Sequence, residues 1–252
     1  MERGLAGSRE RAQALILAGQ VVVGDRRVDK PGTAVPSDAP IRLKGADLPW
    51  VSRGGAKLAG ALDDLGLDPG GWTCLDVGAS TGGFTDCLLQ RGAARVYAVD
   101  VGTGQLAFRL TRDPRVVSLE RTDIRALPEG TVPAPVDLAT IDTSFISLRL
   151  VLPATLPWVR PGGWVLALVK PQFEVGRARV AKGGVVRDET DRQEALESAR
   201  ALAGRLGLVV QGETESRLPG ARSGNREHFM AFRVPTPVGL PPTPLRDGGN
   251  DA

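Results

Sequence analysis

The stretch that decides the fold is LDVGASTGGF, which occupies residues 75–84. It follows an apolar run expected to form a strand over 72–77, and it opens a helical pattern over 82–91. Its glycines allow the backbone to approach a ligand at the carboxyl end of that strand. A dinucleotide-binding loop needs the spacing G-x-G-x-x-G, but Ser80 occupies the second glycine position. A dehydrogenase is therefore disfavoured, because this side chain would crowd a bound pyrophosphate.

Acidic residues follow the next two expected strands: Asp100 ends the strand over 95–100, and Asp123 follows the strand over 116–119. A carboxylate at the first of these places can accept hydrogen bonds from ribose hydroxyls. A glycine-rich loop without the pyrophosphate spacing, followed by two such acids, is typical of class I methyltransferases that use S-adenosylmethionine. The alternative is a simple helix cap with two surface acids. The predicted cofactor-binding residues are Asp76, Gly78, Ala79, Ser80, Gly82, Gly83, Phe84, Asp100 and Asp123.

Strands and helices alternate through the larger part of the chain, which predicts a Rossmann-like α/β fold with a doubly wound, mostly parallel sheet of seven strands. The remaining strands are expected over 136–141, 164–169, 208–211 and 228–234, and the remaining helices over 54–65, 105–111, 148–158 and 189–206. The expected organisation is a small α+β module over 1–46, a linker over 47–51, the methyltransferase domain over 52–234 and a disordered tail over 235–252.

Composition sets limits on function. The 252 residues are 42% hydrophobic and 24% charged, which suits one sizeable core with a small accessory domain. One histidine and two cysteines cannot form a zinc cluster or a disulfide framework, so we expect no metal and a cytoplasmic protein. No apolar run reaches the roughly 18–20 residues that span a bilayer, so no membrane partner is expected. The net charge of +3 permits nucleic-acid binding without establishing it.

Four polar residues lie at junctions that the topology can bring together. Lys57 lies near a helix start before the first strand of the sheet, Asp142 and Lys170 each follow a strand, and Glu227 precedes the last strand. If that last strand is antiparallel, the strand-borne members face one crevice. A lysine has an ordinary pKa of about 10.4, which burial and a second cation lower. These types suit deprotonation of a ribose 2′-hydroxyl, with Lys170 as the base and the other three positioning it; two unrelated ion pairs remain the alternative.

Four segments together resemble the TlyA family: GASTGGF at 78–84, DTSFIS at 142–147, LVKPQFE at 168–174 and SGNRE at 223–227. Members of this family, often labelled hemolysins, are ribosomal RNA cytidine-2′-O-methyltransferases. The resemblance implies an FtsJ-like catalytic domain, S-adenosylmethionine as methyl donor, and ribosomal RNA or ribosomal subunits as partner. It implies 23S RNA as the target, with 16S RNA as a further target left open. The opening at Met1 lacks the Arg-Leu-Asp turn usual in the family, which favours the form that acts on the large subunit. The implied catalytic tetrad maps onto Lys57, Asp142, Lys170 and Glu227.

The resemblance also implies that the amino-terminal module is an S4-like RNA-binding domain. Its sequence VVVGDRRV at 21–28 predicts two short strands around a tight turn with a basic shoulder. In the larger domain, a basic segment over 177–184 is a candidate clamp for an RNA backbone, with a solvated loop as the alternative. The predicted RNA-binding residues are Arg3, Arg9, Arg11, Arg26, Arg27, Arg53, Arg177, Arg179 and Lys182.

Two other classes of function deserve comparison. A membrane-lytic toxin needs a long apolar or strongly amphipathic segment, which we do not find in the sequence. A non-catalytic RNA-binding protein that retains the fold is disfavoured, because the cofactor loop and all four tetrad positions are intact.

Overall fold

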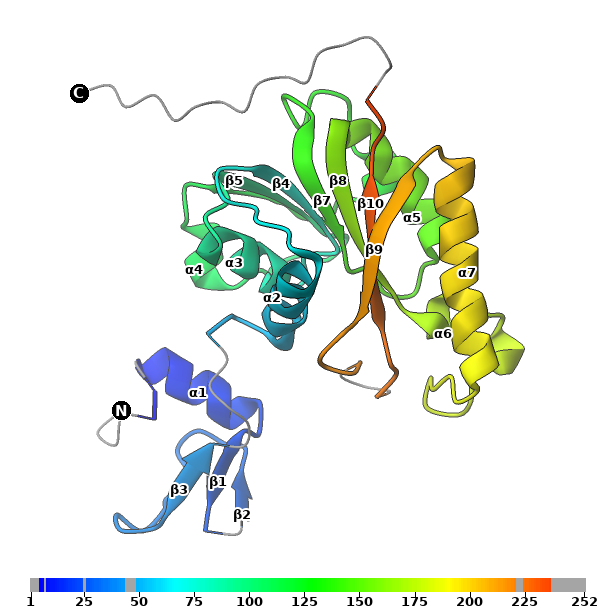
Figure 1. Cartoon of the computed structure of the whole chain (residues 1–252). Coiled ribbons are helices and arrows are strands. Elements are labelled where there is room, and N and C mark those ends of the chain that lie inside the picture. The colour runs from blue at the N-terminus through cyan, green and yellow to red at the C-terminus, as the bar shows by residue number, and fades with distance from the viewer. Residues whose placement is uncertain (1–4, 7, 25, 44–48, 221–223, 237–252) are drawn as a thin grey trace, which may run out of the picture. The chain divides into compact units, whose positions relative to one another are not determined.

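The computed structural model describes residues 5–6, 8–24, 26–43, 49–220 and 224–236. The chain divides into two compact units, Met1–Pro49 and Trp50–Ala252, which are described separately (Figure 1). Most of the segment 235–252, predicted to be a disordered tail, lies outside the described residues.

The first unit has the predicted α+β architecture. Helix α1 is followed by an antiparallel sheet with the strand order β2-β1-β3. Gly24, with φ of 58°, directly follows β1 and supplies the left-handed backbone that a tight turn needs. The few buried apolar side chains of this unit include Leu15 and Val22. The elements are α1 (Arg9–Leu17), β1 (Val21–Val23), β2 (Arg26–Val28) and β3 (Ile41–Leu43).

The second unit contains a sheet of seven strands among its described residues, in the order β6-β5-β4-β7-β8-β10-β9. All neighbours pair in parallel except β10, which is antiparallel to both β8 and β9. This confirms the predicted mostly parallel, Rossmann-like sheet. The strands are β4 (Thr73–Val77), β5 (Arg95–Val99), β6 (Val116–Leu119), β7 (Val136–Ile141), β8 (Val159–Val169), β9 (Val209–Glu215) and β10 (His228–Arg233).

Helices cover both faces of this sheet (Figure 1). Alternate residues of β4 serve the two layers: Cys74 packs in the cluster with α2, α3 and α4, whereas Leu75 and Val77 pack in the cluster with α5 and α7. The helices are α2 (Arg53–Leu65), α3 (Gly83–Gln90), α4 (Phe108–Thr111), α5 (Leu148–Thr155), α6 (Pro171–Glu174) and α7 (Glu189–Arg205), with 3₁₀ turns at Ile124–Ala126, Leu156–Trp158 and Arg177–Arg179. No helix of the described residues is long and apolar enough to span a bilayer.

Some boundaries differ from the sequence expectation. Strand β8 begins at Val159 rather than at 164, and it runs through a Pro-Gly-Gly sequence that is typical of a turn. The pairing of β7 with β8 shifts register at this point, which accommodates the irregular residues. The helix expected over 105–111 is only the single turn α4. Helix α6 was not expected; its first residue, Pro171, suits the first position of a helix because no backbone N–H is needed there.

The sheet positions the candidate residues at one edge. Strands β4, β5, β7 and β8 run in the same direction, so their carboxyl ends lie together. Because β10 is antiparallel, its start lies at that same edge: His228 pairs with Val169. Glu227 precedes His228 and Lys170 follows Val169, which confirms the expectation that both face the same edge of the sheet.

Candidate active site

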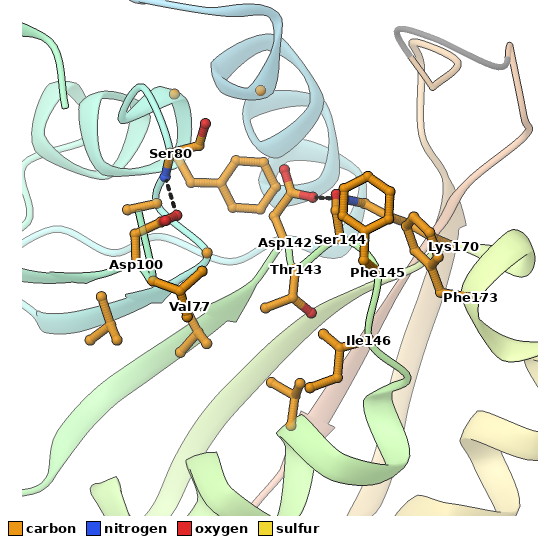
Figure 2. Close-up of a pocket in the computed structure, with 18 of the residues that line it drawn as sticks. Val77, Ser80, Asp100, Asp142, Thr143, Ser144, Phe145, Ile146, Lys170 and Phe173 are labelled. Atoms are coloured by element: carbon orange, nitrogen blue, oxygen red, sulfur yellow. Dashed lines mark hydrogen bonds and ion pairs between the residues drawn. The ribbon is translucent and has the colours of Figure 1, made fainter. Parts of the chain in front are cut away.

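The glycine-rich loop leaves β4 and is tied to the next strand by its own backbone. The N–H groups of Gly78 and Ala79 both donate to the carbonyl of Val99, at 2.9 and 3.2 Å. The Ser80 N–H donates to Asp100 Oδ2 at 2.7 Å (Figure 2), and Gly102 N–H donates to the other carboxylate oxygen at 2.7 Å. Asp100 therefore fixes the loop, and each of its oxygens still has a lone pair to offer a ligand.

Two glycines of this loop are required by close backbone contacts. Gly78 has φ of 88°, and a Cβ at this position would lie 2.7 Å from the carbonyl oxygen of Asp142. A Cβ at Gly83 would lie 2.9 Å from the backbone nitrogen of Gly55. The loop thus packs directly against the segment after β7 and against the start of α2.

Asp76 supports the loop from below. Its side chain is fully buried and accepts hydrogen bonds from Thr85 N at 2.9 Å, Thr85 Oγ1 at 2.7 Å and Thr140 Oγ1 at 3.1 Å. Burial raises the pKa of this carboxyl to about 7, and the nearby Asp142 adds to the shift, while the hydrogen bonds oppose it. Asp76 is not among the residues that line the cleft, so its geometry is that of a support for β4 and α3.

A cleft of about 1330 Å³ opens beside the loop. The predicted cofactor residues that line it are Gly78, Ala79, Ser80, Gly83, Phe84, Asp100 and Asp123, whereas Gly82 and Asp76 lie outside the lining. Asp123 caps the 3₁₀ turn Ile124–Ala126, and its hydrogen bonds with the Arg125 side chain hold the pKa of this carboxyl below its usual range. Arg125 also lines the cleft.

The four tetrad positions form two ion pairs. Lys57 is paired with Glu227, and Lys170 Nζ lies 2.6 Å from Asp142 Oδ1. Lys170 Nζ also donates to Ser144 Oγ at 3.1 Å. Lys57, Lys170 and Glu227 are each less than 9% exposed. Two ion pairs are what the alternative interpretation of these residues expects, and all four residues line the same cleft.

Three further residues at this edge escaped the sequence reasoning. Phe145 is 83% exposed, lines the cleft and packs against Phe173, with ring centroids 5.4 Å apart (Figure 2). Its φ of 67° is unusual for a bulky residue. Glu174 accepts hydrogen bonds from Ser147 and Leu148. The sequence does contain one signal for Phe145: it is one of only six phenylalanines in the chain, and it lies in a polar segment directly after an expected strand.

The predicted RNA-binding residues fall into several groups. Arg9, Arg26 and Arg27 are exposed in the first unit, as are Arg53, Arg177 and Lys182 in the second. Arg53 lines the cleft and donates to the carbonyl of Pro219 at 3.2 Å. Arg179 forms ion pairs with Asp191 and Glu194 of α7, so its charge is already compensated. Arg3 and the side chain of Arg11 lie outside the described residues.

The cleft residues fit an adenosyl group. Asp100 lines the cleft and has acceptor capacity for ribose hydroxyls. Val101, which is 71% exposed, and Ile124 give the cleft apolar surface on which a flat base can lie. Among the described residues no cluster of potential metal ligands occurs.

The glycine-rich loop lies after β4, where the strand order reverses between β5 and β7, which is where ligands bind in open α/β sheets. With its acids after β5 and β6, this arrangement defines the second unit as a class I methyltransferase domain. Residues 50–234 match the family model of FtsJ-like methyltransferases, and residues 2–41 match that of the S4 domain. The chain belongs to the TlyA family of FtsJ-like methyltransferases.

Three relatives illustrate the similarity. The 16S/23S rRNA (cytidine-2′-O)-methyltransferase TlyA of Mycobacterium tuberculosis is 46% identical over 98% of this chain and 92% of its own length. Hemolysin A of Brachyspira hyodysenteriae is 36% identical over 92% of this chain and 96% of its own. The solved structure of a suspected hemolysin from Streptococcus thermophilus is 42% identical, covers 94% of this chain and 86% of its own, and superposes with a TM-score of 0.75.

Proposed function

We propose that the protein transfers a methyl group from S-adenosylmethionine to the 2′-hydroxyl of a cytidine in ribosomal RNA, with Lys170 as the general base. The target proposed is 23S RNA in the large subunit. The S4 domain would hold RNA through phosphate contacts from exposed residues such as Arg9 and Arg26. Such a substrate places the protein in the cytoplasm, where ribosomes work.

One observation carries the catalytic proposal: Lys170 Nζ is held in the cleft by Asp142 at 2.6 Å and Ser144 at 3.1 Å. The cofactor loop lines the same cleft, and Gly78 directly contacts the backbone of Asp142. This backbone contact would therefore fix the position of a methyl donor bound at the loop relative to the base beside Asp142. Lys57, paired with Glu227, lines the same cleft as Lys170.

The chemistry needs a proton acceptor at the moment of attack. S-adenosylmethionine supplies an electrophilic methyl group, and its sulfur keeps the electron pair of the broken C–S bond. Lys170, as the free amine, takes the proton of the 2′-hydroxyl while the oxygen forms the new C–O bond. Asp142 then stabilises the ammonium ion that results, and Ser144 keeps the amine oriented. The proton subsequently passes from Lys170 to water.

The acceptor nucleotide needs a surface to rest on. RNA-modifying enzymes take the target nucleotide out of its stack and hold the base against aromatic side chains. Phe145, exposed beside Ser144 and supported by Phe173, supplies such a surface. We propose that the base of the target cytidine stacks on Phe145.

The test is methyl transfer from labelled S-adenosylmethionine to separate small and large ribosomal subunits that lack the modification. Wild-type protein should place label in 2′-O-methylcytidine of large-subunit RNA, and Lys170→Met should place none while still binding S-adenosylmethionine in calorimetry. Label in the small subunit would extend the target to 16S RNA.

Two outcomes would count against the proposal. Full activity of Lys170→Met would remove this residue from the role of base. Absence of any label from wild type, with S-adenosylmethionine bound, would move the substrate away from ribosomal RNA. As a matched control, Lys30→Met changes an exposed lysine of the first unit and should leave the cleft chemistry intact.

A further inference from the structure

Two short segments of the second unit run side by side at the acceptor side of the cleft. One is the loop 142–147, which connects β7 to α5, and the other is the segment 170–174, which contains α6. Lys170 contacts Asp142 and Ser144, and Phe173 contacts Phe145. The contacts follow the same order along both segments, so the two segments lie side by side and are held together along their length.

Glu174 makes the last of these contacts, at the end of the loop that joins α5. Its Oε2 accepts a hydrogen bond from Ser147 Oγ at 2.7 Å, and its Oε1 accepts one from Leu148 N at 2.9 Å. Ser147 is the N-cap residue of α5, and its hydroxyl oxygen also accepts from Arg149 N at 3.2 Å. Glu174 therefore caps α5 from a different segment of the chain, and it fixes the point where the loop 142–147 joins this helix.

The loop needs such a restraint because of its backbone. Phe145 has φ of 67°, and a bulky residue adopts this conformation only when its surroundings impose it. Phe145 is 83% exposed, so burial of the side chain cannot supply much of the restraint. The loop is held by Lys170, which pairs with Asp142, at one end and by Glu174 at the other, with the Phe173 ring between them.

We infer that Glu174 is a positioning residue for the methyl acceptor: its carboxylate holds the loop 142–147 so that Phe145 and Asp142 face the cleft. The inference rests on the proposed function, because the acceptor that Phe145 receives is the proposed nucleotide. Glu174 does not line the cleft, so it acts through the loop and not by contact with substrate.

The side-chain chemistry gives a discriminating pair of variants. In Glu174→Gln the amide oxygen can accept from Leu148 N, and the amide N–H can donate to Ser147 Oγ, whose hydroxyl reverses its role. In Glu174→Ala both contacts are lost. A displacement of about 1 Å at a reacting centre costs about 100-fold in rate. We expect kcat/KM to fall by about 10- to 100-fold in Glu174→Ala and to remain near wild type in Glu174→Gln.

A double-mutant cycle identifies the route of the effect. If Glu174 acts through Phe145, then Glu174→Ala with Phe145→Ala should lose little more activity than the worse single variant. Affinity for S-adenosylmethionine should stay unchanged in all of them, because the loop 78–84 keeps its own contacts. Asp113→Ala is the matched control. This carboxylate also accepts a hydrogen bond from a backbone N–H, that of Arg115 at 2.9 Å. It lies before β6, at the amino-terminal ends of the parallel strands and so away from the cleft.

Hydrogen exchange provides a readout that does not depend on catalysis. In Glu174→Ala, amides of 142–148 should exchange faster, while those of 75–90 keep the wild-type rate. Unchanged exchange in 142–148, additive losses in the cycle, or a Gln variant as inactive as the Ala variant would each overturn the inference. Absence of label with wild-type protein would instead defeat the proposed function, and the exchange comparison would still test the role of Glu174 in the loop.

Discussion

Gly78 and Asp142 lie so close together that a Cβ at position 78 would be 2.7 Å from the carbonyl oxygen of Asp142. The first residue belongs to the loop predicted to hold the methyl donor, and the second pairs with the proposed base, Lys170. The contact follows from the parallel pairing of β4 with β7, which brings the ends of these strands together. The donor and acceptor sides of the cleft are thus joined by backbone, with no flexible side chain between them.

Substitution of Gly78 by alanine should therefore damage both sides of the cleft. The clash is with backbone atoms, and the φ of 88° is itself strained for alanine. We expect Gly78→Ala to weaken S-adenosylmethionine binding at least about 10-fold and to lower stability by more than about 1 kcal/mol. Calorimetry and denaturant unfolding would measure the two effects.

A second glycine serves as the control for that experiment. Gly204 lies within α7, and nothing lies within 4 Å of where its Cβ would be. Gly204→Ala should raise stability by about 0.5–1 kcal/mol, since alanine is the better helix former, and cofactor affinity should not change. If Gly78→Ala bound the cofactor as tightly as wild type, the close contact would not matter for the site.

The pair Lys57–Glu227 predicts a large effect of breaking a buried ion pair. Lys57→Met leaves the carboxylate of Glu227, which is 3% exposed, without its partner. We expect the free energy of unfolding to fall by about 3–5 kcal/mol. The double variant Lys57→Met with Glu227→Met should recover most of this loss in denaturant unfolding, while methyl transfer stays absent in both. A single variant as stable as wild type would show that the pair contributes nothing to folding.

The fold could be read from the sequence because its signals are local. The apolar strands, the loop 75–84 and the helical patterns each predict their own element, and the alternation predicts the sheet. Phe145 and Glu174 could not be read in the same way. The exposure of Phe145 and its backbone conformation result from how β7 and β8 bring the two segments together. Similarly, the two donors to Glu174, Leu148 N and Ser147 Oγ, are on a different segment, 26 and 27 positions away.

The placement of Asp76 shows a different limit. The sequence places it in the cofactor motif, and the structure buries it completely beneath the loop. A period-two pattern assigns Asp76 to the face of the sheet that carries Cys74, and so toward α3, but a polar residue there is equally compatible with ligand contact. The hydrogen bonds from Thr85 and Thr140 and the absence of Asp76 from the cleft lining distinguish the two roles.

The raised pKa of Asp76 predicts a specific dependence of stability on pH. In the unfolded chain an aspartate has a pKa of about 3.9, and in the folded protein burial raises that of Asp76 to about 7. The folded state then binds its proton more tightly, so this residue lowers stability progressively as pH rises from about 4 to 7.

Substitution by asparagine isolates the contribution of Asp76. Asp76→Asn can keep the hydrogen bonds with Thr85 and Thr140, because one amide atom accepts and the other donates. Its stability relative to wild type should rise by up to about 1.4 kcal/mol for each pH unit between about pH 4 and 7, and then remain constant. Urea unfolding of both proteins at several pH values measures this difference, in which the contributions of other carboxylates cancel. A difference that does not vary with pH would mean that burial does not perturb Asp76.

Substitutions of Phe145 can distinguish the effect of its strained backbone on stability from the effect of its ring on activity. Its φ of 67° costs an alanine about 1 kcal/mol more than a glycine. We therefore expect Phe145→Gly to be more stable than Phe145→Ala by about that amount in denaturant unfolding. Both lack the aromatic ring, so both should raise the KM for ribosomal subunits to a similar extent while leaving S-adenosylmethionine affinity unchanged. Phe145→Trp, which keeps an aromatic surface, should retain the KM of wild type.

If the glycine variant kept wild-type activity, then the ring would not be the surface on which the base rests. If the alanine variant were the more stable of the two, then the left-handed backbone at this position would not be imposed by the loop.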